Sequence, residues 1–147
     1  MSDEVAIEFW QGVEQFNQRE YYACHDTLEA IWMEASEPQK TFYQGILQVA
    51  VALYHLGNQN LRGATILLGE GINRLRRYQP DYAEVNVAEF VSQSLHLLAL
   101  LQQAAPDQVA LLVEQVTQPP DKTPSGAARD DRFNPPLPLP LISKVSN

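Results

Sequence analysis

Residues 39–68 read QKTFYQGILQVAVALYHLGNQNLRGATILL and predict the centre of the molecule. As far as Leu56 the run is apolar nearly all round a helix, which is typical of a helix enclosed by neighbours. Gly57-Asn58 follows, and these residue types best tolerate the left-handed backbone that ends helices. A second helix is expected over about Leu61–Arg77, closed by Pro80. The stretch therefore predicts a tight antiparallel helical hairpin.

Four further helices are expected on either side of this hairpin. Residues 4–18, the stretch to about 35, residues 84–104 and residues 106–116 carry apolar side chains at helical spacing. No segment alternates convincingly with a period of two, so no sheet is expected. A tetratricopeptide-like array would need a repeat of matching positions, and none is visible. We predict an all-α, compact multihelical bundle of antiparallel helical hairpins, with five to six helices.

Composition and charge restrict the partners. The 147 residues are 45% hydrophobic and carry a net charge of −8, which is ordinary for a soluble globular protein. Residues 1–37 hold nine acidic side chains against Arg19 alone, so nucleic acid is not expected as a partner. The most apolar stretch, residues 46–56, is too short to span a bilayer, and no signal peptide is evident. One cysteine fits a reducing compartment, so a cytoplasmic location is expected.

The amino-acid composition of the chain changes after residue 117. We place a helical domain at residues 1–117 and an extended, proline-rich tail at residues 118–147, which hold seven of the ten prolines. Proline at this density favours extended structure. Residues 132–142 are nevertheless too apolar for a purely solvated tail. We hypothesise that they lie in a groove between helices, on the same subunit or on a neighbour in a homo-oligomer.

Two polar stripes form the candidate site. His25, Glu29 and Trp32 have the i, i+4, i+7 spacing that places side chains on one edge of a helix. A second stripe on the central helix comprises Gln44, Gln48 and His55. Either the second stripe is simply the solvent side, or it faces the first across a cleft between the second and third helices.

If the stripes meet, three interpretations remain open. The first is a satisfied polar network with no function of its own. The second is a small-ligand pocket that uses all six residues, walled by Trp32 and a nearby tyrosine. The third is a divalent metal site on His25, Glu29 and His55. We favour a module that binds a small molecule or a protein, with no cofactor. The rival is a hydrolase-like enzyme with Glu29 as general base and a metal on His25 and His55.

The motifs also resemble a known family. FNQREYYACHDTLEAIW at residues 16–32 and FYQGILQVAVALYHLGNQNLRGATILL at residues 42–68 are similar to the domain-of-unknown-function 309 family over about Phe9–Leu75. The resemblance implies an all-α fold, no assigned activity, and characteristic positions at all six candidate residues. Two departures stand out: Asp26 replaces a common glutamate, and Arg19 replaces a glycine that often turns the chain.

Overall fold

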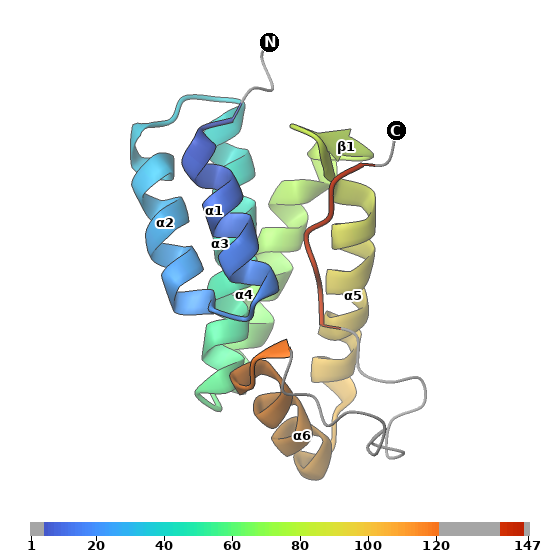
Figure 1. The fold of residues 1–147 in the computed structure, drawn as a ribbon. Helices are drawn as coiled ribbons and strands as arrows, with labels where there is room; N and C mark the ends of the chain where they lie inside the picture. Colours follow the sequence, from blue (N-terminus) through green and yellow to red (C-terminus); the bar gives the residue numbers. More distant parts are fainter. Residues whose placement is uncertain (1–4, 121–138, 146–147) are drawn as a thin grey trace.

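The computed structural model describes residues 5–120 and 139–145 (Figure 1). Six α-helices, a short 3-10 helix (η1) and one β-hairpin make up this part of the chain. In order they are α1 (Ile7–Asn17), α2 (Tyr21–Glu34), α3 (Gln39–Gly57), α4 (Leu61–Leu75), η1 (Arg76–Tyr78), β1 (Asp81–Tyr82), β2 (Val85–Asn86), α5 (Val87–Gln103) and α6 (Pro106–Thr117). The predicted all-α bundle is confirmed. None of the described helices has the length and apolar character needed to cross a membrane.

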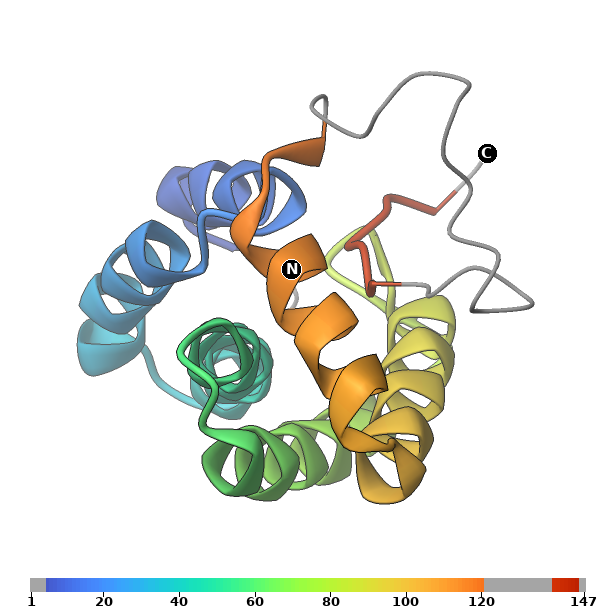
Figure 2. The ribbon, with the colours of Figure 1, turned by 90° about the horizontal axis from the view of Figure 1, so that it is seen from below.

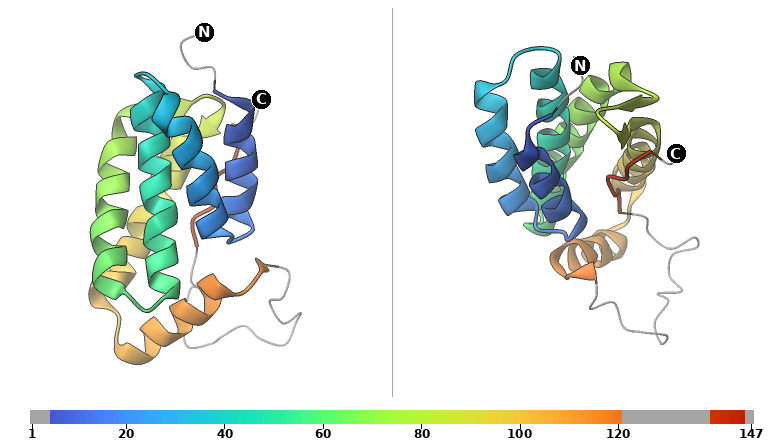
Figure 3. Two further views of the ribbon diagram at one scale, coloured as in Figure 1. Left: turned by 90° about the vertical axis from the view of Figure 1, so that its left-hand side faces the viewer. Right: turned by 45° about the horizontal axis from the view of Figure 1, so that its top comes forward.

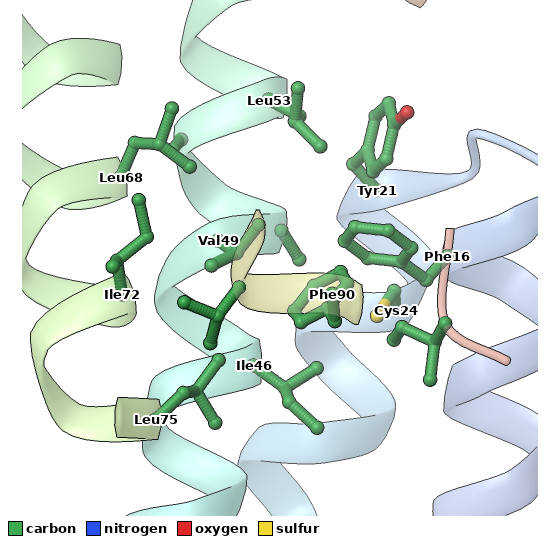
Figure 4. Packing of buried hydrophobic residues seen from close by; sticks show 14 of the residues in the cluster. Phe16, Tyr21, Cys24, Ile46, Val49, Leu53, Leu68, Ile72, Leu75 and Phe90 are labelled. Atoms are coloured by element: carbon green, nitrogen blue, oxygen red, sulfur yellow. The ribbon is translucent and has the colours of Figure 1, made fainter. Parts of the chain in front are cut away.

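Helix α3 lies at the centre of the bundle, as its sequence predicts. It packs against α2 on one side and α4 on the other, while α6 crosses its C-terminal end (Figure 2). Its buried side chains meet those of α4 in one apolar layer (Figure 4). Members of this layer are Ile46, Val49, Leu53, Leu68, Ile72 and Leu75.

Two glycines set how closely α3 and α4 approach. A Cβ atom at Gly71 of α4 would lie 2.8 Å from the carbonyl oxygen of Gly45 of α3 and 2.9 Å from Val49 Cγ2. Real side chains do not tolerate such distances to a backbone atom. The absence of both side chains therefore allows the two backbones to touch.

The prediction of no sheet is wrong between η1 and α5. The expected helix over residues 84–104 begins only at Val87, and a two-stranded antiparallel hairpin precedes it, pairing Asp81 with Asn86 and Tyr82 with Val85. Both turn residues, Ala83 and Glu84, have positive φ. Strands of two residues are too short to show an alternating pattern, so the sequence carried no periodicity from which to predict them.

The turn after α3 also differs from expectation. The left-handed residue is Gln59, with a φ of 64°, and not Gly57 or Asn58. Helix α3 continues through Gly57, and the amide of Asn60 donates back to the carbonyl of His55 at 2.8 Å. The side chain of Asn60 then caps α4 by accepting from the amide of Gly63 at 2.9 Å.

Residues 139–145 lie between α1 and α5, beside the hairpin (Figure 1). Leu139 and Ile142 are buried there, and Lys144 pairs with Val85 as an antiparallel bridge. Of the segment predicted to lie in a groove, residues 132–138 fall outside the described residues. The remaining four, with the three that follow, pack on the helices of their own chain.

Candidate functional site

On the exposed edge of α2, a histidine lies between two carboxylates. His25 Nε2 is 3.6 Å from Glu29 Oε2, one helical turn further on, and His25 Nδ1 is 3.2 Å from Asp26 Oδ1. The side chains are 25%, 49% and 62% exposed for His25, Glu29 and Asp26. The pair predicted from the i, i+4 spacing therefore forms, but water reaches both carboxylates.

Two tyrosines extend this edge onto α3. The rings of Tyr22 and Tyr54 lie 5.2 Å apart between centroids, and the Tyr22 ring lies 5.9 Å from that of His25. Tyr22 is 57% exposed and Tyr54 39% exposed. The two rings are tilted by 43° to each other, and their exposed parts can contact a ligand.

The second stripe lies on the outer face of α3, toward α4. Gln48 Nε2 donates to Glu70 Oε1 at 3.2 Å, and Arg74 Nη1 donates to Gln48 Oε1 at 3.2 Å. Gln44 and His55 lie within about 40° of Gln48 around the helix at 100° per residue. Because α3 stands between α2 and α4 on this face (Figure 3, left), the stripe looks outward and its amide at Gln48 is engaged with α4. All three side chains of this stripe are half-buried, and the hydrogen bonds of Gln48 go to α4.

Trp32 is engaged with the start of α3. Lys40 Nζ lies 4.6 Å from the centre of the Trp32 ring and donates to the Trp32 carbonyl at 2.9 Å. The indole Nε1 is buried and has no hydrogen-bond partner among the described residues. The indole is thus covered by a lysine of its own chain.

The structure does not assemble the predicted metal set of His25, Glu29 and His55. Within residues 5–120 and 139–145, no three His, Cys, Asp or Glu side chains are grouped so that they could hold a metal ion. The reason is the position of His55, which shares the outer stripe of α3 with Gln48, whereas the other two residues lie on α2.

Two surface hollows flank α2. One, of about 370 Å³, lies where the start of α2, the end of α3 and the end of α6 meet, and its walls include Tyr22, Tyr54 and Val116. The other, of about 640 Å³, lies between α1, α2 and the start of α3, and Tyr43 is part of its wall. Neither is lined by any of the six predicted residues.

Arg19, beside the smaller hollow, has a role that was not predicted from the sequence. Arg19 has a φ of 64°, and its Nη1 donates to the carbonyl oxygens of Gln115 at 2.9 Å and Gln118 at 3.4 Å. The guanidinium thereby satisfies carbonyls at the C-terminal end of α6, where a cation is also favoured by the helix dipole. The family resemblance implies a glycine at this position and so agrees with the positive φ, but the contact with α6 had no signal in the sequence.

Buried below this edge, Cys24 is fully enclosed. Burial raises the pKa of its thiol to about 12, and burial also raises the pKa of the neighbouring Tyr21. A protonated, enclosed thiol is neither a nucleophile nor a metal ligand at neutral pH. Cys24 therefore acts as a small apolar side chain of the core.

The geometry describes an all-α domain with a half-exposed polar and aromatic surface on α2 and α3. Residues 9–67 match the sequence profile of the family described as "Domain of unknown function (DUF309)". The family resemblance is confirmed for this part of the chain, which contains most of α1, all of α2 and α3, the first half of α4 and all six candidate residues. The family's description assigns no activity.

One curated relative matches part of the chain. The chain is 40% identical over 65 residues to the "Uncharacterized protein YpuF" of Bacillus subtilis (strain 168), a match that covers 44% of this chain and 37% of that protein. The chain thus spans little more than a third of the length of the relative that it matches. No solved structure matches the chain significantly.

Proposed function

We propose that this domain is a binding module that uses the α2–α3 edge to hold a cationic group of its partner. The observation that carries the proposal is the exposed tyrosine pair, Tyr22 and Tyr54, beside the carboxylates of Asp26 and Glu29. Ring faces and carboxylates together attract an ammonium or guanidinium group, because both present negative potential.

The surroundings of the tyrosine pair support a ligand of modest size. The adjoining hollow of about 370 Å³ is at the lower end of the range for small-ligand pockets. The excess of acidic side chains over residues 1–37 adds attraction at longer range. A basic side chain presented by a protein and a small quaternary ammonium compound share this chemistry.

A titration with matched probes tests the proposal. We would add acetyl-Gly-Arg-Gly-amide, its neutral counterpart acetyl-Gly-Gln-Gly-amide, and tetramethylammonium to isotope-labelled protein and follow the amide signals by NMR. We expect the two cationic probes to shift signals around Tyr22 and Tyr54 and the neutral peptide to leave them unchanged. Stronger binding of the peptide would indicate a protein partner, and stronger binding of tetramethylammonium a small molecule.

Two variants make the titration specific. Tyr22→Ala removes one ring face and should weaken cation binding about two- to fivefold, since an exposed cation–π contact contributes about 0.5–1 kcal/mol. Met33→Ala, which changes another exposed side chain of α2, is the matched control and should bind as the parent does. Equal shifts with the neutral peptide, or unaltered binding by Tyr22→Ala, would show that the tyrosine pair is not the site.

A further inference from the structure

A second surface, on the opposite side of α1 from α2, already holds a peptide. Residues 139–145 lie extended between α1 and α5 and continue along the outer strand of the hairpin (Figures 1 and 3). We call this surface the α1–α5 groove and define it by the side chains of Trp10, Asn17, Glu89 and Gln93 and by the backbone of residues 84–86.

The groove grips the backbone of the segment. Asn17 binds both backbone groups of one residue: its Nδ2 donates to the carbonyl of Ile142 and its Oδ1 accepts from the amide of Ile142, both at 2.9 Å. Gln93 Oε1 accepts from the amide of Leu141 at 2.9 Å. The two side-chain amides thus satisfy three backbone groups of the extended segment.

The hairpin continues the same mode of binding. The amide of Asn86 donates to the carbonyl of Ser143 at 2.8 Å, and the amide of Val145 donates to the carbonyl of Glu84 at 2.9 Å. The segment thus adds a strand to the edge of the hairpin, as peptides do when they bind by β-augmentation.

Side chains give the groove its selectivity. Ile142 is 3% exposed and Leu139 is 8% exposed, whereas Leu141 between them is 49% exposed. Lys144 Nζ lies 4.5 Å from the centre of the Trp10 ring, and Ser143 Oγ donates to Glu89 Oε1 at 2.8 Å. Pro140 is buried as well, so the groove selects the pattern Leu-Pro-x-Ile-Ser-Lys in an extended peptide.

The chain that joins this segment to the bundle is long. Residues 121–138 separate the two described parts, and 18 residues span at most about 60 Å when extended. That length reaches the groove of the same molecule or of a neighbour. The contacts in the groove would be identical in either case, which is the condition for exchange of an element between two copies.

We propose that the α1–α5 groove is a peptide-binding site that also accepts residues 139–145 of a second copy of this chain. The site is independent of the cation site proposed on α2 and α3. Because the segment belongs to the same chain as the groove, its effective concentration there is on the order of millimolar. Exchange therefore becomes measurable when one copy has lost its own segment from the groove.

Two full-length variants test the exchange by complementation. Ile142→Asp places a carboxylate in the buried position, so its groove empties while the groove itself stays intact. Asn17→Ala removes both hydrogen bonds to Ile142, so its groove is damaged while its segment remains able to bind. We expect each variant alone to sediment as a monomer and their mixture to form a one-to-one dimer. A segment that is bound within its own chain at a millimolar effective concentration must have a dissociation constant at least about tenfold lower, and the same constant should govern the dimer.

Leu141→Asp is the matched control, because residue 141 is exposed and its substitution leaves the segment bound. This variant mixed with Asn17→Ala should remain monomeric. A monomeric mixture of Ile142→Asp with Asn17→Ala, or equal dimer formation by the control, would overturn the proposal.

Unmodified protein provides a second measurement in case a variant fails to fold. Isotope-labelled wild-type chain is mixed with unlabelled peptide LPLISKV, residues 139–145, at several millimolar. We expect the backbone amide signal of Ile142 to move, because the labelled segment leaves the groove. The side-chain amide signal of Asn17 should stay where it is, because the unlabelled peptide makes the same hydrogen bonds to Asn17. An unmoved Ile142 signal would overturn the proposal.

Discussion

Placing a side chain at Gly71 should drive α3 and α4 apart. In Gly71→Ala the new Cβ would meet the Gly45 carbonyl oxygen at 2.8 Å and two atoms of Val49 at 2.9 and 3.2 Å. Backbone atoms of a neighbouring helix cannot rotate away as a flexible side chain can. The helices must therefore separate, and the apolar layer between them loses contact along its length.

The expected magnitude follows from two opposing effects. Alanine is favoured over glycine inside a helix by about 1 kcal/mol, whereas overpacking a core costs typically about 1–3 kcal/mol. Contact with backbone places this case at the upper end, so we expect a net loss of about 2 kcal/mol in the free energy of unfolding. For a domain of this size that corresponds to a melting temperature lower by roughly 4–8 °C.

Gly69→Ala is the matched control, two residues away on α4. A Cβ atom there meets nothing within 4 Å, so only the helix preference acts, and stability should rise by up to about 1 kcal/mol. Urea and thermal unfolding followed by circular dichroism measure both variants. If Gly71→Ala were as stable as the parent, or if both alanines had the same effect, the close approach of the two backbones would be refuted.

Three further predictions concern single side chains. Arg19→Gly relieves the positive φ but loses the hydrogen bond to the Gln115 carbonyl. Hydrogen exchange of backbone amides should therefore accelerate in α6 and not in α3. Equal exchange rates in the variant and the parent would show that Arg19 does not hold α6 in place. Burial raises the pKa of Cys24 from 9.0 to about 12, so the folded chain keeps a proton that the unfolded chain releases. Stability should therefore fall as pH rises from about 9 to 12, and Cys24→Ala should reduce that slope in pH-dependent urea unfolding. Asn60→Ala removes the cap on the Gly63 amide and should cost about 1 kcal/mol in thermal unfolding; Asn60→Asp, which can still accept, should cost less.

The helical hairpins were predictable because each helix carries a clear apolar stripe and each joint is short. The β-hairpin at residues 81–86 could not be predicted, because its strands are only two residues long. Its turn also places Ala83 and Glu84 at positive φ, where glycine or asparagine is expected. Similarly, the left-handed turn after α3 fell on Gln59 and not on the adjacent Gly57 or Asn58. Local residue preference was overridden in both places by contacts made elsewhere in the fold.

The candidate site was only partly predictable for a related reason. The i, i+4 spacing correctly placed His25 beside Glu29, because it depends on one helix alone. The direction in which the stripe of α3 faces depends on where α2 and α4 pack, and periodicity around a single helix does not contain that information. The contact of Gln48 with Glu70 and Arg74 became visible only in three dimensions. The binding role of the six residues stays a prediction.

The tail segment has a consequence for how the protein is made. Asn17 and Ile142, which meet in the α1–α5 groove, are separated by 125 positions in the chain. The groove is complete only once Gln93 has been added, 48 positions before its partner Leu141, which is roughly 2–10 seconds earlier at a translation rate of about 5–20 residues per second. During that interval the α1–α5 groove is not yet occupied by residues 139–145 of its own chain. A chaperone or a neighbouring polypeptide with a similar extended sequence can then bind there.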